Sequence, residues 1–594
     1  MESKKRTGLF SLFFRMFRQV LAIHPVLFGL NYVVAAAAGI LSSQGIIWLQ
    51  KIYDTLFEAV RDGKIKDVIF MLFIWFGIKA AGELMTGLYN IMGEEHAMQT
   101  EKGLGKNING KVGRLEPIMF ESEETLNSIQ RSYRGAGVGR NFVNEFLTGF
   151  FLYLPYFGTL FLYLYRQEKK LGLIILVIFA VTLLSQAVKS KFYVELEEET
   201  AGCQRKIKYY SGCINGRDMG KESRSLSICP FLTKKVKDAL SEWNGYRKKQ
   251  WKKGAATDLI LAVMTFFSFV GIVLLMFYDL TKGVITVGLF AGIFCSVDSI
   301  FEMTEGFVSD CLEYGAALRG RIEGYLDFCR MPEKPASGIR LTKHGTVAAK
   351  NVSFRYPGSG RKAVDGVDLT IKEGETVAVV GENGSGKTTL VRLLAGIFLP
   401  MEGEVVHNGK STVEYERFSF YQGMTGVFQN FGKYKISLLD NIRISDFREK
   451  IEKETERKEL ARLGLTVKEE IFPQDFETVL APEYGGADLS GGQWNRIAIR
   501  RGLFRKHEMI LLDEPTAAID VMEEKRIYEQ FIKMCKGKTA LIVTHRLAST
   551  RLADQIVVMD QGRIVGFGKH EELLSTCGKY KEMWEIQKEV FFCT

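Results

Sequence analysis

Six long apolar runs constrain the first half of the chain more than any other feature. They lie near residues 26–49, 67–92, 146–165, 171–189, 256–278 and 283–305. A helix needs about 20 mainly apolar residues to cross the hydrocarbon core of a bilayer, and each run is close to that length. The sequence therefore predicts six membrane-spanning helices.

The loops between these runs differ in length and in charge. The first, third and fifth loops are short, and "RQEKK" is all that joins the third run to the fourth. The second and fourth loops are long and largely helical in pattern, and the fourth is rich in lysine and arginine. Basic loops stay on the cytosolic side, and long structureless loops are uncommon. We therefore predict an integral protein of the inner or plasma membrane, with helices that continue into the cytosol and both termini on that side.

The N-terminal segment reads "MESKKRTGLFSLFFRMFRQVLAIHP". Arginines interrupt its apolar stretch, and it lacks a small-residue cleavage site. These features predict an interfacial helix that lies on membrane lipid over residues 1–25, not a cleaved signal peptide.

Charge and cysteine content exclude several classes of protein. A net charge of +10 would suit nucleic-acid binding. The excess, however, lies largely between the apolar runs, where lysine and arginine mark membrane topology, so we expect no nucleic-acid partner. None of the nine cysteines forms a CxxC pair, which argues against zinc and thioredoxin-like sites.

The sixth apolar run carries three acidic residues on one helical face. Asp298, Glu302 and Glu305 are spaced i, i+4 and i+7. One interpretation is the acidic wall of a cavity open to the cytosol. The other is a helix that leaves the membrane with solvated acids, and the sequence leaves both open.

The stretch "ETVAVVGENGSGKTTLVRLLAG" has the pattern of a strand, a glycine-rich loop and a helix. Gly381, Gly386, Lys387 and Thr388 match the phosphate-binding pattern GxxxxGK[ST]. In such a loop, backbone N–H groups and the helix N-terminus hold phosphates, the lysine reaches the β- and γ-phosphates, and the hydroxyl ligates Mg²⁺. ATP and Mg²⁺ are therefore the expected cofactors.

The stretch "MILLDEP" supplies the second half of an ATPase site. Its four apolar residues predict a buried strand that ends in Asp513, where a carboxylate can hold Mg²⁺ directly or through water. Glu514 follows and is the candidate general base for the attacking water.

With these motifs, the chain resembles the ATP-binding-cassette (ABC) transporters, in particular half-size exporters with membrane and ATPase regions in one polypeptide. The resemblance covers nearly the whole chain, and the motifs occur in family order. It implies that Tyr356 in "VSFRYPG" stacks on adenine and that Gln429 in "VFQNF" approaches Mg²⁺ and the water. It also implies that His545 in "VTHR" contacts the γ-phosphate and that Asp520 lies in an inter-subunit loop.

The resemblance implies an all-α six-helix transmembrane domain with long cytosolic helical extensions, followed by an α/β P-loop ATPase domain with a helical subdomain. The expected divisions are a helix over 1–25, a transmembrane domain over 26–325, a linker over 326–343 and an ATP-binding domain over 344–594. The implied nucleotide-binding residues are Tyr356, Gly381, Asn383, Gly384, Ser385, Gly386, Lys387, Thr388, Thr389, Ser490, Gly491, Gly492, Gln493 and Asp520. The implied metal ligands are Thr388, Gln429 and Asp513, and the implied catalytic residues are Glu514, His545 and Gln429.

A second phosphate turn, "DLSGGQW", matches the signature of the family at Ser490, Gly491, Gly492 and Gln493. The resemblance implies two cassettes packed head to tail, so that this turn serves the nucleotide of a second subunit. Because Glu514 and the signature are both intact, two copies of this chain would form two complete sites. We therefore expect a homodimer, with a heterodimer as the alternative.

The stretches "APEYGGADLSGGQW" and "VFQNFGKYKISLLDNI" resemble bacterial exporters of lantibiotics and other ribosomal peptides that lack a peptidase domain. "DEPTAAID" differs slightly from the family at Ala517 and Ile519. The expected function is export of a peptide or other amphipathic substrate by alternating access, with cassette contacts near 117–129 and 214–224. A multidrug or lipid exporter, a siderophore importer and an ATP-driven sensor remain the alternatives.

Overall fold

The computed structural model describes residues 8–62, 65–172, 180, 200, 202–297, 299–304, 306–307, 319–333, 338–514, 531, 535–545, 550 and 553–592. The chain forms two compact units. Met1–Gly113 and Leu126–Met331 make up the first, here called the helical unit. Arg114–Thr125 and Pro332–Thr594 make up the second, here called the α/β unit.

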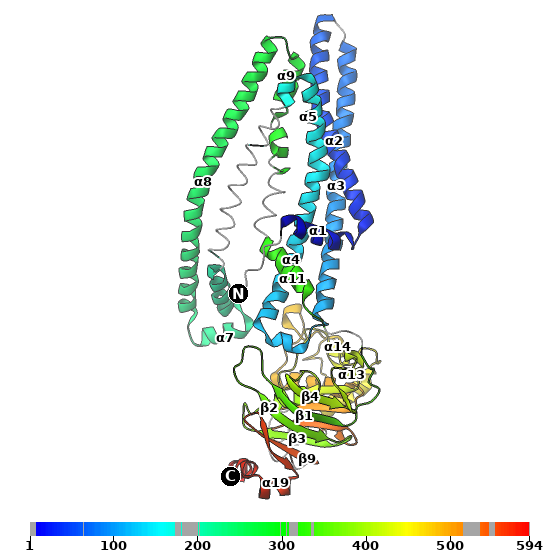
Figure 1. Ribbon diagram of the computed structural model, residues 1–594, viewed down its shortest axis with the longest axis vertical. Helices are drawn as coiled ribbons and strands as arrows, with labels where there is room; N and C mark the ends of the chain where they lie inside the picture. Colours follow the sequence, from blue (N-terminus) through cyan, green and yellow to red (C-terminus); the bar gives the residue numbers. More distant parts are fainter. Residues whose placement is uncertain are drawn as a thin grey trace. The chain divides into compact units, whose positions relative to one another are not determined.

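The helical unit consists of long helices (Figure 1). Its elements are α1 (Leu9–Leu21), α2 (Pro25–Asp62), α3 (Ile65–Val112), α4 (Glu123–Thr148, whose first turn belongs to the α/β unit), the π-helical turn η2 (Gly149–Tyr153), α5 (Leu154–Gln167), α7 (Arg217–Ser225), α8 (Cys229–Thr281), α9 (Val287–Phe294) and α11 (Arg319–Arg330).

Two of these helices are far longer than a membrane is thick. Helix α3 has 48 residues and α8 has 53. At 1.5 Å per residue they are about 70–80 Å long, against ~30 Å of hydrocarbon. Both must therefore continue beyond the bilayer, as the sequence predicts.

Within the described ranges, four helices are long and apolar enough to cross a membrane: Pro25–Val60, Ile65–Val112, Glu123–Gln167 and Ala262–Thr281. They overlap the first, second, third and fifth predicted spans. Most of the fourth, 171–189, lies outside the described residues. In the sixth, 283–305, helix α9 ends at Phe294 and a turn follows. The number of six spans stays a prediction.

Backbone packing holds the membrane helices together at one point that only glycine allows. A Cβ on Gly39 of α2 would lie 2.2 Å from the carbonyl oxygen of Leu152 in η2. Beside this contact, a core of apolar side chains forms around Leu160 and Met276. The interior of the helical unit therefore depends on close helix contact as well as on apolar burial.

The α/β unit contains two sheets with helices around them (Figure 1). The four-stranded antiparallel sheet has the order β2-β1-β4-β5, and the six-stranded sheet has the order β10-β9-β3-β8-β7-β6. The strands are β1 (Val347–Phe354), β2 (Val364–Ile371), β3 (Thr376–Gly381), β4 (Glu402–His407), β5 (Lys410–Ser411), β6 (Met424–Val427), β7 (Met509–Asp513), β8 (Thr539–Val543), β9 (Gln555–Asp560) and β10 (Arg563–Gly568).

The helices of this unit are η1 (Pro117–Glu121), α12 (Lys387–Leu394), α13 (Arg417–Gln422), α14 (Leu438–Arg443), α15 (Lys453–Arg462), η3 (Asp475–Glu477), η4 (Pro482–Tyr484), α16 (Gly491–Phe504), α19 (His570–Thr576) and α20 (Gly578–Phe592). Between α14 and α16 the chain forms a helical subdomain with its own core, in which Phe472, Phe476 and Trp494 are buried.

The segment 114–125 belongs to the α/β unit although it connects two helices of the other unit. Ile118 of η1 packs against the core around the β-sheets. Arg417 donates to the carbonyl oxygen of Leu115 at 3.0 Å, and Arg392 lies 3.8 Å from Glu121. The expected cassette contact is thus confirmed for residues 117–121, whereas the second expected contact, α7, lies in the helical unit.

A buried ion pair ties α15 to α16 inside the helical subdomain. Arg500 donates from Nε and Nη2 to the two carboxylate oxygens of Glu456, both at 2.6 Å. The side chains are only 10% and 5% exposed. Such a pair is expensive to break, because one charge is then left buried without its partner.

We predict that Glu456→Gln lowers the free energy of unfolding of the α/β unit by about 3 kcal/mol. The matched control is Glu477→Gln, which removes the exposed partner of Lys453 (2.9 Å) and should cost less than about 1 kcal/mol. Urea denaturation of the full chain in detergent measures both. Equal losses in the two variants would contradict the special cost of the buried pair.

Candidate nucleotide-binding site

The site forms where two parallel strands of the six-stranded sheet end. Strands β3 and β7 both pair in parallel with β8, so their carboxyl ends meet at one edge. Gly381 ends β3 and Asp513 ends β7. Both strands are buried because their residues are almost all apolar, and this is the edge of an α/β sheet at which ligands bind.

The loop from Gly381 to Lys387 needs its glycines. Gly384 and Gly386 have φ angles of 80° and 102°, in the region that favours glycine. A Cβ on Gly386 would lie 2.3 Å from the carbonyl oxygen of Ala363. Helix α12 starts directly after this residue, so the turn aims the helix N-terminus and its free N–H groups at the loop.

Lys387 is buried at the base of this loop. Its ammonium donates to the carbonyl oxygens of Gly381 and Glu382, both at 2.9 Å. Burial lowers the pKa of Lys387, and the nearby carboxylates of Glu514 and Asp513 oppose that shift. The arrangement thus holds a desolvated cation inside a ring of backbone groups, which suits an anionic phosphate.

Asp513 and Thr388 form an oxygen pair beside the loop. The Thr388 hydroxyl donates to Asp513 Oδ1 at 2.9 Å. Burial raises the pKa of Asp513 even though this hydrogen bond lowers it. In the described part of the chain, no three His, Cys, Asp or Glu side chains cluster closely enough to hold a metal by themselves. Mg²⁺ at nucleotide sites needs only one or two protein oxygens plus phosphate, and this pair fits that requirement.

Two side chains hold the carboxylate of Glu514. Gln429 Nε2 donates to Oε2 at 2.8 Å, and His545 Nδ1 lies 3.3 Å from Oε1. The backbone of Glu514 has a φ of 48°, which is uncommon for a residue with a side chain. Because strained backbone concentrates at functional sites, this geometry agrees with the choice of Glu514 as a candidate catalytic group.

A cavity of about 610 Å³ brings most of the predicted residues together. Tyr356 bounds it, with its hydroxyl 3.1 Å from Thr389 Oγ1. The lining residues are Tyr356, Ala363, Asn383, Gly384, Gly386, Lys387, Thr388, Thr389, Gln429, Glu514 and His545. The predicted Ser385 is buried beside them. The size is that of a small-molecule site.

The signature turn is a separate feature of the same unit. Ser490 Oγ caps α16 by accepting from the backbone N–H of Gln493 (3.2 Å), and Gln493 Oε1 accepts from the Ser490 N–H (2.8 Å). Gly491 and Gly492 follow in the first turn of α16. The lining of the cavity contains none of these residues.

Four of the predicted site residues are not among those that line this cavity. Asp520, Asp298 and Glu305 lie outside the described residues. Glu302 is exposed on the described part of the sixth run. The interpretation of these acids as a cavity wall therefore stays a prediction.

The C-terminal helix α20 also contacts the site, and no motif in the sequence predicts this. Lys579 of α20 pairs with Glu382 of the phosphate loop at 2.5 Å, and Gln587 donates to the carbonyl oxygen of His545. Ala363, which lines the cavity, was also missed. These contacts depend on how α20 and β2 pack, and no local motif signals them.

Comparison with known proteins agrees with this geometry. Residues 28–205 match the family described as ABC transporter transmembrane region, and residues 364–517 match ABC transporter. The chain is an ABC transporter. It is an integral membrane protein whose cassette hydrolyses ATP and couples hydrolysis to transport.

Relatives of this transporter include two bacterial transport ATP-binding proteins and a bacterial flippase. It is 27% identical to the subtilin transport ATP-binding protein SpaT of Bacillus subtilis, over 99% of this chain and 97% of the relative. It is 35% identical to the nisin transport ATP-binding protein NisT of Lactococcus lactis subsp. lactis, over 40% of each. It is 30% identical to the ATP-dependent lipid A-core flippase of Chromobacterium violaceum, over 66% of this chain and 63% of the relative.

A solved structure shares the fold. The transporter superposes on a bacterial Atm1-family ABC exporter with ATP bound, with a TM-score of 0.74 at 19% identity, over 94% of this chain and 98% of the other. The predicted fold class, a helical transmembrane domain followed by an α/β ATPase domain, is thereby confirmed.

We predict that Asp513→Asn stabilises the nucleotide-free protein at neutral pH. Burial raises the pKa of Asp513, so folding disfavours its charged form. The free-energy cost of burying the carboxylate therefore grows as the pH rises above the ordinary carboxyl pKa of about 4. The gain in the thermal midpoint should shrink as the pH falls towards that value, where the wild-type carboxyl is also neutral.

Asp513 is also a candidate Mg²⁺ ligand. With ATP bound, Mg²⁺ should therefore raise the thermal midpoint of the wild type more than that of Asp513→Asn, because an amide oxygen is a weaker ligand for a hard cation. Thermal unfolding of the full chain with ATP alone and with ATP plus Mg²⁺ measures this. A destabilised nucleotide-free variant would contradict the cost assigned to the buried charge.

Proposed function

We propose that this transporter is a homodimer that exports an amphipathic peptide from the cytosol by alternating access. The observation that carries the substrate class is the similarity to a subtilin transport protein over 99% of the chain. This match includes the membrane region, in which a substrate must bind, and not only the cassette. The exporter fold supports the direction of transport.

In the proposed ATPase cycle, Gln429 and His545 hold the carboxylate of Glu514 from two sides. Positioned in this way, Glu514 orients and deprotonates the attacking water. Lys387 and the amides of the phosphate loop bind the β- and γ-phosphates. Thr388, Asp513 and Gln429 are the proposed protein ligands of Mg²⁺, which neutralises phosphate charge when it is bound. Tyr356 is the proposed adenine contact.

The proposed dimer explains why one chain has two phosphate-binding turns. The turn at Ser490 begins a helix of 14 residues whose first N–H groups can bind an anion. Because this turn lies outside the cavity formed by its own chain's phosphate loop, we infer that it caps the γ-phosphate in a second copy of the chain. Asp520 is the proposed residue of the inter-subunit loop.

Lipid export is the second candidate. Its support is the 30% identity to the ATP-dependent lipid A-core flippase of Chromobacterium violaceum, which extends over 66% of this chain. The smaller coverage makes it weaker than the whole-length match to a peptide transporter.

The expected subunit arrangement is two identical chains. Native mass measurement in lipid nanodiscs should give twice the chain mass of 67.1 kDa. Adding ATP to Glu514→Gln should hold the two cassettes together, because bound nucleotide is then not split. A monomer under both conditions would contradict the homodimer.

The function is tested by ATP turnover of the lone chain in nanodiscs, with Glu514→Gln as the blank. We expect turnover above the blank, raised by a cationic amphipathic peptide and not by lipophilic drugs. Stimulation by lipids alone would favour the second candidate. Turnover no higher than the blank would contradict ATP hydrolysis by this chain alone and would indicate that a different partner subunit is needed.

A further inference from the structure

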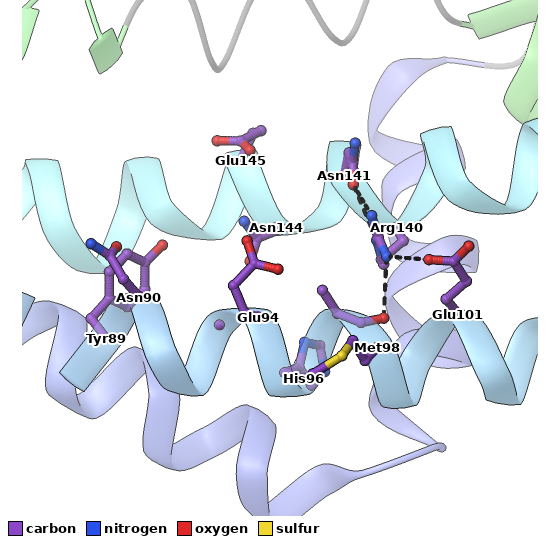
Figure 2. A pocket seen from close by; sticks show the side chains of 12 residues that line it. Tyr89, Asn90, Glu94, His96, Met98, Glu101, Arg140, Asn141, Asn144 and Glu145 are labelled. Carbon is purple, nitrogen blue, oxygen red and sulfur yellow. Dashed lines mark hydrogen bonds and ion pairs between the residues drawn. The ribbon is translucent and has the colours of Figure 1, made fainter. Parts of the chain in front are cut away.

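The helical unit contains a polar pocket of about 440 Å³ between α3 and α4. Figure 2 shows that its guanidinium, Arg140, bonds to neighbours in the same pocket. Nη1 donates to Glu101 at 3.1 Å, and Nε and Nη2 donate to Asn141 Oδ1 at 3.1 and 2.9 Å. Asn144 accepts from the hydroxyl of Tyr32 at 2.9 Å. These bonds join α2, α3 and α4 to one another. The contacts of α20 are different, because they reach the nucleotide site from outside its cavity.

The C-terminal helix α20 is held on the α/β unit by a buried tyrosine. Tyr580 is fully buried and packs in one core with Val380 of β3. Its hydroxyl lies 3.0 Å from Thr550 Oγ1 and 2.8 Å from His570 Nδ1. The ring of Trp584, one turn further along the helix, packs edge to face with the ring of His570. The helix is therefore held beside the strand that leads into the phosphate loop.

Two polar side chains of α20 reach the nucleotide site from this position. Lys579 pairs with Glu382 of the phosphate loop at 2.5 Å, and Gln587 donates from Nε2 to the carbonyl oxygen of His545. The two positions are about two helical turns apart, or ~12 Å along the axis. Helix α20 thus bridges the phosphate loop and the residue whose side chain contacts Glu514.

The contact with His545 matters because burial does not hold this imidazole. The side chain is 49% exposed, and its Nδ1 lies 3.3 Å from Oε1 of Glu514. On the N-terminal side, the N–H of Thr544 donates to the carbonyl oxygen of Val379 in β3 at 3.3 Å. On the other side, Gln587 holds the carbonyl group of His545. Because a residue has only two soft backbone dihedral angles, contacts on both sides restrict the direction in which this side chain leaves the backbone.

The contact with Glu382 holds the other end of the bridge. The carbonyl oxygen of Glu382 accepts from Lys387 at 2.9 Å, while its side chain pairs with Lys579. Lys579 lowers the pKa of Glu382, and Glu382 raises the pKa of Lys579, as expected for an ion pair. The two side chains are 62% and 31% exposed, so the pair adds little stability by itself. The contact that bears on the chemistry is therefore the one made by Gln587.

We propose that Gln587 is a positioning residue for ATP hydrolysis, which acts through His545 on the carboxylate of Glu514. Its amide holds the backbone of His545, so that the imidazole stays beside Glu514. The proposal rests on the proposed roles of His545 and Glu514. It makes the C-terminal helix part of the ATPase site.

The test measures kcat and KM for ATP with the full chain in lipid nanodiscs. Gln587→Met removes the donor and keeps a long, unbranched side chain that favours helix, and Gln587→Lys restores a donor. The matched control is Lys588→Met, which places the same side chain at the next, exposed position of α20. His545→Ala is measured in parallel because it removes the imidazole itself, and Glu514→Gln is the blank.

Gln587→Met should lower kcat about fivefold and leave KM for ATP within about twofold, because the lost contact orients a group that acts in the transition state. Gln587→Lys should recover at least about half of the wild-type kcat, and Lys588→Met should stay within about twofold of the wild type. His545→Ala should lower kcat more than Gln587→Met does. The thermal midpoint and the binding of a fluorescent ATP analogue should be the same in Gln587→Met and Lys588→Met, which separates positioning from a loss of fold.

A wild-type kcat in Gln587→Met, a loss that Lys588→Met shares, or a loss that Gln587→Lys does not recover would each overturn the proposal. A higher KM at unchanged kcat would overturn it in favour of a contact that serves nucleotide binding. In these cases the proposed ATPase site stands if His545→Ala lowers kcat. If His545→Ala hydrolyses ATP as fast as the wild type, the proposed role of His545 itself fails, and with it the route from Gln587 to Glu514.

Discussion

The parallel pairing of β3, β8 and β7 is the constraint on which the ATP-binding site depends. Val543 of β8 is the register partner of Val379 on one side and of Asp513 on the other. This register places the start of the phosphate loop and the acidic end of β7 at one level, so that Thr388 and Asp513 meet at 2.9 Å. Apolar burial of the three strands thus positions the polar groups that are proposed to bind nucleotide and Mg²⁺.

The polar groups at this edge work against the stability of the nucleotide-free protein. Burial lowers the pKa of Lys387 and raises the pKa of Asp513, so the fold disfavours the charged form of each. The strained backbone at Glu514 adds to this cost. In the proposed site, phosphate would supply the charge opposite to Lys387, and a divalent cation would supply the charge opposite to Asp513. The site is therefore destabilised in a way that favours its ligand, as is common where function and stability compete.

Local patterns in the sequence predict what depends on local geometry. The phosphate loop, the strand that ends at Asp513 and the helix cap at Ser490 are each determined within a few residues, and the long helices follow from their apolar runs. Contacts between distant elements have no such signal. The approach of α20 to the site through Lys579 and Gln587 depends on tertiary packing. The turn in the sixth apolar run falls at Cys295 and Ser296, so it contains neither glycine nor proline.

The segment 114–125 joins two helices of the helical unit but packs within the α/β unit. It connects α3 to α4, and Ile118 of η1 packs against the core around the β-sheets. Arg392 of α12, the helix that begins at Lys387, lies 3.8 Å from Glu121 of η1. A displacement of α12 on nucleotide binding would therefore act on the chain between α3 and α4. Coupling of this kind is reciprocal: if bound nucleotide changes the affinity of the helical unit for a ligand, that ligand changes the affinity for nucleotide by the same factor.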